Sequence, residues 1–230
     1  FGKAFGQALA ARGASVVQLD LDFEEAKAAA LEIGSRAEAV QGDVSDEDRM
    51  NAVMADVAAR HGGIDILINN AGIHSAEANK PFGALGIKAA RRMFEVNVWG
   101  VINCTLAARP HMAGRAGASM VNIASMAAYG ARMAYGVTKL TVRGLTMSFA
   151  HELAPDGIRV NAIAPGLIFT DTIRAELNPE LIKQVMLTQI IQREGEVRDV
   201  VDAMLHLASD SASFMTGETV RVSGGSTLQI

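Results

Sequence analysis

The sequence predicts an α/β fold, a single doubly wound domain with a central parallel sheet flanked by helices. Short apolar, β-branched runs alternate with amphipathic stretches along the whole chain, which is typical of βαβ units that build a parallel sheet. The run 64–68 is almost wholly apolar, as expected of a strand that helices cover on both faces. No internal repeat or linker divides the 230 residues, so one domain over 1–230 is the simplest organisation.

The elements of the first half follow from local composition. Segment 1–13 predicts a helix that ends at Gly13, because glycine commonly closes helices. Ser45 is the predicted N-cap of a later helix. Strands are predicted where β-branched residues lie between glycine or aspartate, and helices where alanine and glutamate recur. On this basis the strands cover 14–19, 37–40 and 64–68, and the helices cover 23–33 and 46–60.

The second half repeats the same alternation, with longer helices. Its strands are again rich in valine and isoleucine, and its helices carry apolar residues at helical spacing. The predicted strands cover 118–123, 158–163 and 219–222, and the predicted helices cover 88–108, 134–152 and 197–208. Ligands of such sheets bind beyond the carboxyl ends of the strands, so the residues that follow each strand are the candidate site.

Composition excludes several function classes. The formal net charge is −4 and no basic run is present, which argues against nucleic acid or an anionic membrane surface as a partner. Arg91 and Arg92 are interpreted as a solvated helix face. The single cysteine, Cys104, fits a reducing, cytoplasmic compartment and is interpreted as a small buried residue rather than a catalytic thiol. The five histidines lack metal-ligand spacing, so no metal site is predicted, and no apolar stretch is long enough to cross a bilayer.

The first segment carries part of a dinucleotide-binding unit. In such a unit a glycine-rich turn opens a helix whose N-terminus holds the pyrophosphate, and an acid after the next strand binds the adenosine ribose. Gly2 takes the place of the last glycine, and Asp20 follows 18 residues later. A carboxylate at this position repels a 2′-phosphate, so Asp20 favours NAD over NADP. A plain surface acid is the alternative, and Asp22 competes for the role.

The chain begins at Phe1, and the strand and earlier glycines of that unit are not in the sequence. That strand would lie in the middle of the sheet, where its neighbours depend on it for backbone hydrogen bonds. We therefore expect the natural chain to be longer at its N-terminus.

Two further turns follow predicted strands. Asp43 is placed to accept a hydrogen bond from an adenine amino group, and Val44 to cover the ring. Asn70, Ala71 and Gly72 form a small-residue turn that allows the backbone to approach a ligand closely. Neither turn is specific alone, since such turns are also common where no ligand binds.

A candidate acid/base pair lies on the helix over 134–152. Tyr135 and Lys139 are four residues apart and therefore share one helix face. A nearby ammonium lowers the pKa of a phenol, which would suit Tyr135 to exchange a proton with a substrate oxygen. Ser125, after the strand over 118–123, offers a hydroxyl for that oxygen. Asn97 is polar within an apolar helix and is predicted to bond a backbone carbonyl and to hold a relay water; a satisfied core asparagine is the alternative.

Together these residues resemble the short-chain dehydrogenase/reductase family over nearly the whole chain, from Phe1 to about Gly225. The resemblance extends to Thr216-Gly217, to Ser223-Gly224-Gly225 and to the segment Asn161-Ala162-Ile163-Ala164-Pro165-Gly166. It implies a Rossmann-type oxidoreductase in which the nicotinamide carries the hydride. One departure is the interval between Ser125 and Tyr135, which is a few residues shorter than usual.

The resemblance also implies the roles of the matching positions. Tyr135 would be the acid/base, Lys139 its electrostatic partner and a ribose contact, Ser125 the substrate-orienting hydroxyl and Asn97 the relay residue. The following positions would also contact the cofactor: Pro165, Gly166, the Ile168 backbone beside the nicotinamide amide, and the Thr170 hydroxyl. A homotetramer is implied, paired through the helices that hold Asn97 and Tyr135 and through segment 220–230, with a dimer as the alternative.

The predicted function is hydride transfer between NAD(H) and a secondary alcohol or ketone. One alternative is an NADP-dependent 3-oxoacyl reductase, which Asp20 argues against. The other is a non-catalytic dinucleotide-binding scaffold, which the set of Ser125, Tyr135 and Lys139 argues against. Segment 171–193 is predicted to cover the substrate, and its apolar residues do not identify the substrate.

Overall fold

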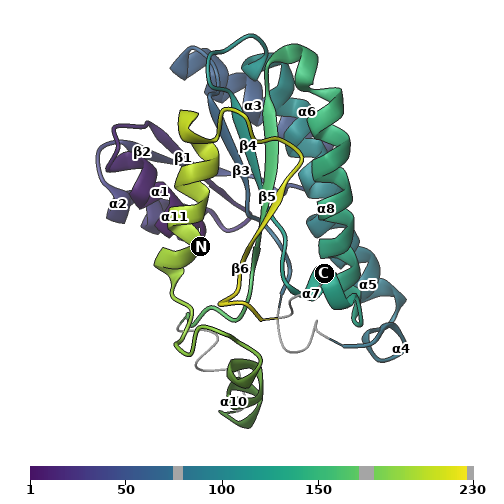
Figure 1. Ribbon diagram of the computed structural model, residues 1–230. Coiled ribbons are helices and arrows are strands. Elements are labelled where there is room, and N and C mark those ends of the chain that lie inside the picture. The colour runs from purple at the N-terminus through teal and green to yellow at the C-terminus, as the bar shows by residue number, and fades with distance from the viewer. Residues whose placement is uncertain (75–79, 171–178, 227–230) are drawn as a thin grey trace.

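The computed structural model describes residues 1–74, 80–170 and 179–226, and Figure 1 shows their arrangement. These residues form six strands, and every hydrogen-bonded pair among them is parallel. They are β1 (Val16–Asp20), β2 (Ala37–Gln41), β3 (Ile66–Asn69), β4 (Ser119–Ile123), β5 (Arg159–Pro165) and β6 (Thr219–Val222). The predicted α/β class and each predicted strand are therefore confirmed, with ends that shift by at most two residues.

The strands form two hydrogen-bonded groups rather than one continuous sheet. β1 pairs with β2, and the other four strands pair in the order β3-β4-β5-β6. Within the described residues no ladder joins the two groups. Because all pairs are parallel, the carboxyl ends of the strands in each group lie at one edge, which is where ligands bind in this class of fold.

Helices cover both faces of the four-stranded group. In Figure 1, α3 (Glu47–His61), α6 (Gly100–Met112) and α8 (Ala134–Glu152) lie on one side, and α1 (Gly2–Ala10) and α11 (Val197–Ala208) lie on the other. The remaining helices are α2 (Phe23–Ile33), α4 (Phe82–Leu85), α5 (Ile87–Phe94), α7 (Ala127–Gly130) and α10 (Pro179–Leu187), with 3-10 turns at Ala154–Asp156 and Asp210–Ala212.

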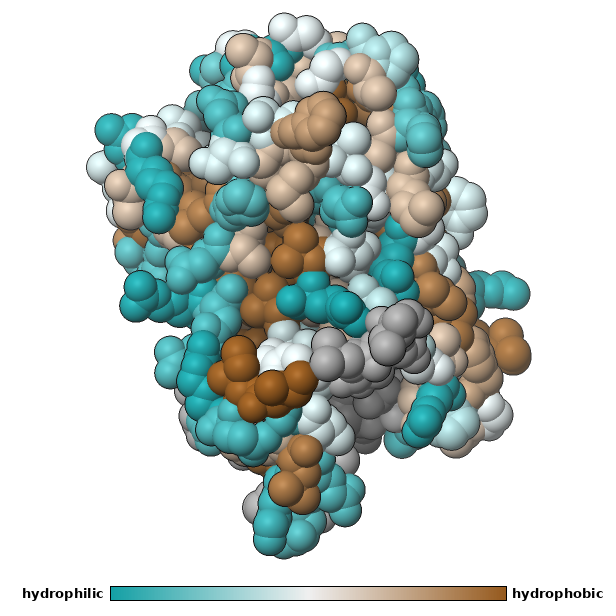
Figure 2. Space-filling view, viewed as in Figure 1, coloured by the Kyte–Doolittle hydropathy of each residue, from teal (hydrophilic) through white to brown (hydrophobic). Residues whose placement is uncertain are grey.

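Two apolar clusters fill the space between these layers. One joins β4 and β5 to the helices α3, α6 and α8, and the other joins the opposite face of the same strands to α1 and α11. Every residue of β4 is buried, whereas β3, where the sequence predicted a strand covered on both faces, is half-buried except at Asn69. On the face seen in Figure 2, apolar side chains gather in the lower half, near α10. Leu187, Ile190 and Ile191 are exposed on and just after that helix.

Three boundaries differ from the sequence prediction. The helix predicted over 88–108 is a continuous run of α5, a π-helical turn η1 (Glu95–Trp99) and α6. The N-cap of α3 is Asp46, whose carboxylate accepts the Arg49 N–H at 2.9 Å, because the Ser45 hydroxyl is used by Asp43 instead. Helix α1 ends at Ala10, and Gly13 closes the turn that follows with a left-handed φ of 92°.

Candidate active site

Tyr135 and Ser125 meet at the carboxyl end of β4. Tyr135 lies in the first turn of α8, and Ser125 lies two residues beyond β4. Burial raises the pKa of Tyr135, and a hydrogen bond with the Ser125 side chain offsets part of that rise. The Ser125 hydroxyl also accepts the Ala127 N–H at 3.1 Å, which fixes its position. The two hydroxyls that the sequence selected therefore face one another.

Lys139 lies one helical turn after Tyr135 and is only 5 % exposed. Its ammonium donates a hydrogen bond of 2.6 Å to the Ile123 carbonyl at the end of β4, and its Nζ lies 5.8 Å from the centroid of the Tyr135 ring. Burial lowers the pKa of Lys139 to about 8. The expectation that Lys139 leaves Tyr135 with a lowered pKa is wrong within the described residues, because burial of the phenol outweighs the other contributions.

Asn97 holds the loop after β3 in place. It is completely buried in the π-helical turn. Its Oδ1 accepts the Ile73 N–H at 2.7 Å and its Nδ2 donates to the Ile73 carbonyl at 3.2 Å. Nδ2 also lies 3.1 Å from the hydroxyl oxygen of Thr138. The predicted bond to a backbone carbonyl is confirmed, while the relay water stays a prediction.

The loop after β3 approaches Asn97 and Lys139 closely at Gly72. A methyl group added at Gly72 would lie 3.3 Å from Asn97 Oδ1 and 3.4 Å from Lys139 Nζ. Contacts of this length are tighter than ordinary packing, so only glycine fits there without a shift. Ala71 and Gly72 are exposed and Asn70 is half-buried. The turn therefore presents exposed backbone beside the acid/base pair, as the sequence predicted.

Two residues of this group escaped the sequence analysis. The His74 ring lies 4.5 Å from the Tyr135 ring, centroid to centroid, and so contacts the candidate acid/base. Thr138 donates its hydroxyl to the Tyr135 carbonyl at 2.7 Å and links Tyr135 to Asn97. Thr138 could have been found from its position between Tyr135 and Lys139 in the sequence. His74 is a lone histidine after a turn, and nothing in the sequence marks it.

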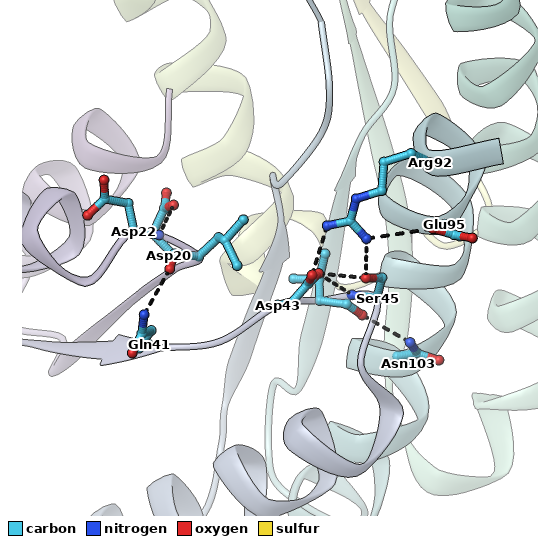
Figure 3. Close-up of polar contacts among 10 residues, drawn as sticks. Asp20, Asp22, Gln41, Asp43, Ser45, Arg92, Glu95 and Asn103 are labelled. Atoms are coloured by element: carbon cyan, nitrogen blue, oxygen red, sulfur yellow. Dashed lines mark hydrogen bonds and ion pairs between the residues drawn. The ribbon is translucent and has the colours of Figure 1, made fainter. Parts of the chain in front are cut away.

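A second polar cluster, shown in Figure 3, surrounds Asp43. One Asp43 oxygen accepts the Ser45 N–H at 2.9 Å and the Ser45 hydroxyl at 2.7 Å, and the other accepts Arg92 Nη2 at 2.8 Å. Burial acts to raise the pKa of Asp43, but the hydrogen bonds from Ser45 and Arg92 outweigh it and hold the pKa below its usual value. The cluster keeps Asp43 ionised. A carboxylate oxygen of Asp43 could then accept a hydrogen bond from the amino group of a ligand.

The interpretation of Arg92 as a solvated surface residue is wrong. Besides Asp43, it donates to the Ser45 hydroxyl at 2.6 Å, and this fixes the loop after β2 against α5. Val44 fixes the same loop against α6. Its carbonyl accepts Asn103 Nδ2 at 3.0 Å, and a methyl group added at Gly100 would lie 2.6 Å from Val44 Cγ2. Val44 is 8 % exposed, so it offers little side-chain surface to a ligand. Its predicted contact with an adenine ring stays a prediction.

Asp20 lies at the end of β1 and is exposed. Its carboxylate accepts the Asp22 N–H at 3.1 Å. Asp22 itself caps α2, accepting the N–H groups of Glu24 and Glu25 at 3.0 and 3.4 Å. Asp22 is therefore committed to capping α2, whereas the Asp20 carboxylate accepts only the Asp22 N–H among the hydrogen bonds of the described residues.

The pocket next to Asp20 measures about 560 Å³ and is lined by Asp20, Leu21, Asp22, Phe23, Glu24 and Gln41. Three of these side chains are acidic, and none of the residues that line it in the described structure is basic. The Arg49 guanidinium lies outside this lining and bonds the Gln41 carbonyl, with Nε at 3.0 Å. Such a lining repels a phosphate monoester and suits a neutral, hydroxyl-bearing group.

The other predicted cofactor positions lie along the same edge. Gly2 approaches the loop after β3: a methyl group there would lie 3.1 Å from Asn70 Nδ2. Gly166 is held by a 2.8 Å bond from its N–H to the Val222 carbonyl, next to the buried Pro165. Ile168 is buried and pairs with Gly195, and the Thr170 N–H donates to the Ile168 carbonyl at 3.1 Å.

These features together test whether a dinucleotide fits the chain. Glycine is required at Gly72, where the backbone lies against Lys139. The described lining of the pocket at Asp20 carries acidic side chains and no basic one, and the hydrogen bonds from Ser45 and Arg92 hold Asp43 ionised. The residues fit the group: Asp20 and Asp43 would hold the adenosine half, and Asn70 to Gly72 with Lys139 would hold the half that carries the reactive ring.

Other chemistry finds no support in the described residues. Cys104 is buried and burial raises its pKa to about 12, which confirms it as a packing residue rather than a nucleophile. In the part of the chain that the structure describes, no three His, Cys, Asp or Glu side chains group as metal ligands. No described helix is long and apolar enough to cross a membrane.

Comparison with known proteins identifies the family of the chain. Residues 1–227 match the family model described as enoyl-(acyl carrier protein) reductase. The chain is 38 % identical over 231 residues to the cis-4-hydroxycyclohexanecarboxylate dehydrogenase of Sinomonas cyclohexanicum, covering 98 % of this chain and 92 % of the relative. It is 37 % identical over 232 residues to a 3-oxoacyl-[acyl-carrier-protein] reductase of Staphylococcus aureus, with 97 % and 92 % covered.

A solved structure shows the same likeness in three dimensions. The short-chain dehydrogenase/reductase of Brucella melitensis, titled a glucose/ribitol dehydrogenase, superposes with a TM-score of 0.87 at 33 % identity, covering 99 % of this chain and 92 % of that one. The chain belongs to the short-chain dehydrogenase/reductase family and is an NAD(P)-dependent oxidoreductase that acts on CH–OH groups.

Proposed function

We propose that the protein interconverts a secondary alcohol and a ketone with NAD(H), using Tyr135 as acid/base. The observation that carries the proposal is that Tyr135 and Ser125 meet at the carboxyl end of β4, where the Ser125 side chain acts to lower the pKa of Tyr135, in a site that also holds the buried Lys139 and the exposed turn at Gly72. Two hydroxyls that face one another beside exposed backbone can hold a single substrate oxygen between them.

In ketone reduction, Ser125 orients the carbonyl oxygen and Tyr135 donates its proton to that oxygen as negative charge develops there. The raised pKa keeps Tyr135 protonated at neutral pH, which is the form that this step needs. The bound dinucleotide supplies the hydride. In alcohol oxidation Tyr135 must first lose its proton, so the oxidation rate is expected to rise with pH.

Lys139 and Asn97 support this proton transfer. The Lys139 ammonium lies 5.8 Å from the Tyr135 ring centroid and would stabilise the phenolate that forms once the proton has left. Asn97 secures Ile73, and through it the position of Gly72 against Lys139. A proton path to solvent would run from Tyr135 past Lys139 and Asn97.

The preference for NAD over NADP is part of the proposal. The acidic lining of the pocket at Asp20 disfavours a 2′-phosphate, and the dinucleotide folds that accept this phosphate provide an arginine near the acid's position. The alternative is an NADP-dependent 3-oxoacyl reductase, which the likeness to the S. aureus enzyme favours. Because the Sinomonas relative is a cis-4-hydroxycyclohexanecarboxylate dehydrogenase, the first substrates to test are cyclic secondary alcohols, including hydroxy acids.

Comparing NADH with NADPH as reductants for a panel of cyclic and linear ketones tests the proposal. We expect kcat/KM to be higher with NADH than with NADPH. Asp20→Ser should lower the ratio of these two kcat/KM values by about tenfold, since it removes one carboxylate from the place where the 2′-phosphate would lie. Asp48→Ser, an exposed acid outside the pocket, is the matched control. A preference for NADPH in the wild-type protein would favour the acyl-reductase alternative, and no turnover with either nucleotide would favour a scaffold.

We also propose that the protein is a cytoplasmic homotetramer, with a dimer as the alternative. Its long helices carry exposed apolar side chains that suit self-association: Trp99, Leu106, Leu140 and Met147. Light scattering during size-exclusion chromatography measures the mass, and a monomer of about 24 kDa at micromolar concentration would contradict this part of the proposal.

A further inference from the structure

Outside the active site, two arginines converge on Tyr129, the tyrosine that precedes Tyr135 in the chain. Tyr129 lies in α7, between Ser125 and Tyr135 in sequence. The guanidinium carbon of Arg143, from α8, lies 3.9 Å from the centroid of the Tyr129 ring. That of Arg221, from β6, lies 5.5 Å from the same centroid. Two consecutive helices and a strand distant in sequence therefore bring two cations to one aromatic ring.

These residues line a pocket of about 470 Å³ together with Ala128, Leu140 and Thr219. No acidic side chain lines the pocket in the described part of the chain, although the protein as a whole carries a net charge of −4. Two guanidinium groups beside one ring give the described part of this pocket a positive electrostatic potential. A pocket of this composition is therefore electrostatically suited to an anion.

Arg143 supplies a second, independent observation. Its Nε is buried and has no hydrogen-bond partner within the described residues. Buried donors are nearly always paired, and an unpaired one suggests a water or ion that belongs there. Stacking on Tyr129 fixes the plane of the guanidinium, and its in-plane N–H groups match the geometry of a carboxylate or phosphate.

We propose that the pocket formed by Tyr129, Arg143 and Arg221 binds a small oxyanion, a carboxylate or a phosphate, that accepts a hydrogen bond from Arg143 Nε. The occupant would rest on α7, whose Ala127 N–H bonds the Ser125 hydroxyl. A methyl group at Gly136 would lie 2.7 Å from the Ala127 carbonyl, so α7 is also packed against the first turn of α8. Occupancy is therefore expected to stabilise the loop between Ser125 and Tyr135.

Titration with inorganic phosphate tests the proposal, at an ionic strength held constant with sodium chloride. Isothermal calorimetry and thermal unfolding should show saturable binding to the wild-type protein. Arg143→Gln should weaken the affinity about tenfold or more by removing the charged donor. Arg143→Lys keeps the positive charge but lacks the planar set of guanidinium N–H groups, so it should bind phosphate with intermediate affinity. Arg198→Gln is the matched control, because Arg198 is 83 % exposed and lies outside the pocket.

Amide hydrogen exchange locates the anion independently of affinity. Phosphate should slow exchange over 127–131 in the wild-type protein and in Arg198→Gln, but not in Arg143→Gln. The proposal is overturned if wild-type binding is not saturable, or if Arg143→Gln and Arg198→Gln bind equally well. It is also overturned if NADH abolishes phosphate binding, which would place the ion in the dinucleotide site. A changed oligomeric state in Arg143→Gln with unchanged phosphate affinity would assign the pocket to a second copy of the chain instead.

Discussion

Replacing Lys139 with methionine should make the protein more stable at neutral pH while it abolishes turnover. Lys139 is 5 % exposed, and burial lowers its pKa from 10.5 to about 8. Each pKa unit corresponds to about 1.4 kcal/mol, so keeping this buried side chain charged at pH 7 costs about 3 kcal/mol. Methionine has a similar length and no charge. The variant loses the bond to the Ile123 carbonyl, which costs about 1–2 kcal/mol, so the net gain is about 1–2 kcal/mol.

The sign of the pH dependence distinguishes this cause from better packing. Below pH 8, Lys139 is protonated in both the folded and the unfolded chain, and the whole charging cost is present. Between about pH 8 and 10.5 the unfolded chain binds more protons than the folded one, so the wild-type protein gains stability as pH rises. The advantage of Lys139→Met should therefore shrink or reverse by pH 10.

Urea unfolding of both proteins at pH 7 and pH 10 measures the two differences. Lys27→Met, at an exposed lysine on α2, is the control and should show no comparable change between the two pH values. The reasoning would be refuted by a Lys139→Met protein that is less stable than the wild type by the same amount at both pH values.

Two further predictions concern residues that hold the loops of the site. Asn97→Ala should lower the free energy of unfolding by about 2 kcal/mol, because the Ile73 N–H and carbonyl lose their buried partner. It should also lower kcat. An unchanged midpoint of urea unfolding would contradict the first expectation. Arg92→Gln should cost less than about 1 kcal/mol, since the pair is partly exposed, but it should weaken NADH binding in a fluorescence titration. Arg92 helps to hold the pKa of Asp43 low, so the pKa of Asp43 should be higher in Arg92→Gln. The loss of stability on acidification should then begin at a higher pH than in the wild type. Acid unfolding curves that coincide for the two proteins would contradict this prediction.

The fold was predictable from the sequence because short apolar strands alternate with amphipathic helices along the chain. β4 and β5 consist mainly of apolar residues and are almost entirely buried, and such segments between amphipathic ones leave few alternatives to a parallel sheet. The exact ends were less predictable. The N-cap of α3 went to Asp46 rather than Ser45 because Asp43 accepts the Ser45 hydroxyl, and only the folded chain brings Arg92 to complete that cluster.

The acid/base pair was predictable because Tyr135 and Lys139 are neighbours on one helix. Their protonation was not, since the pKa of each depends on burial by elements distant in sequence. The contact between His74 and Tyr135, and that between Arg143 and Tyr129, join residues from separate elements and had no sequence signal. The π-helical turn that holds Asn97 likewise depends on tertiary packing around Ile73.

Tyr135→Phe tests the central role of Tyr135 most directly, with Tyr129→Phe as the control because these are the only two tyrosines in the chain. Ketone reduction and NADH binding should be measured on the same preparations. We expect Tyr135→Phe to bind NADH as the wild type does and to lose about a thousandfold in kcat, the range of general acid catalysis, while Tyr129→Phe keeps its turnover. A Tyr135→Phe protein that keeps kcat within about tenfold of the wild type would contradict the assignment of Tyr135 as the proton donor.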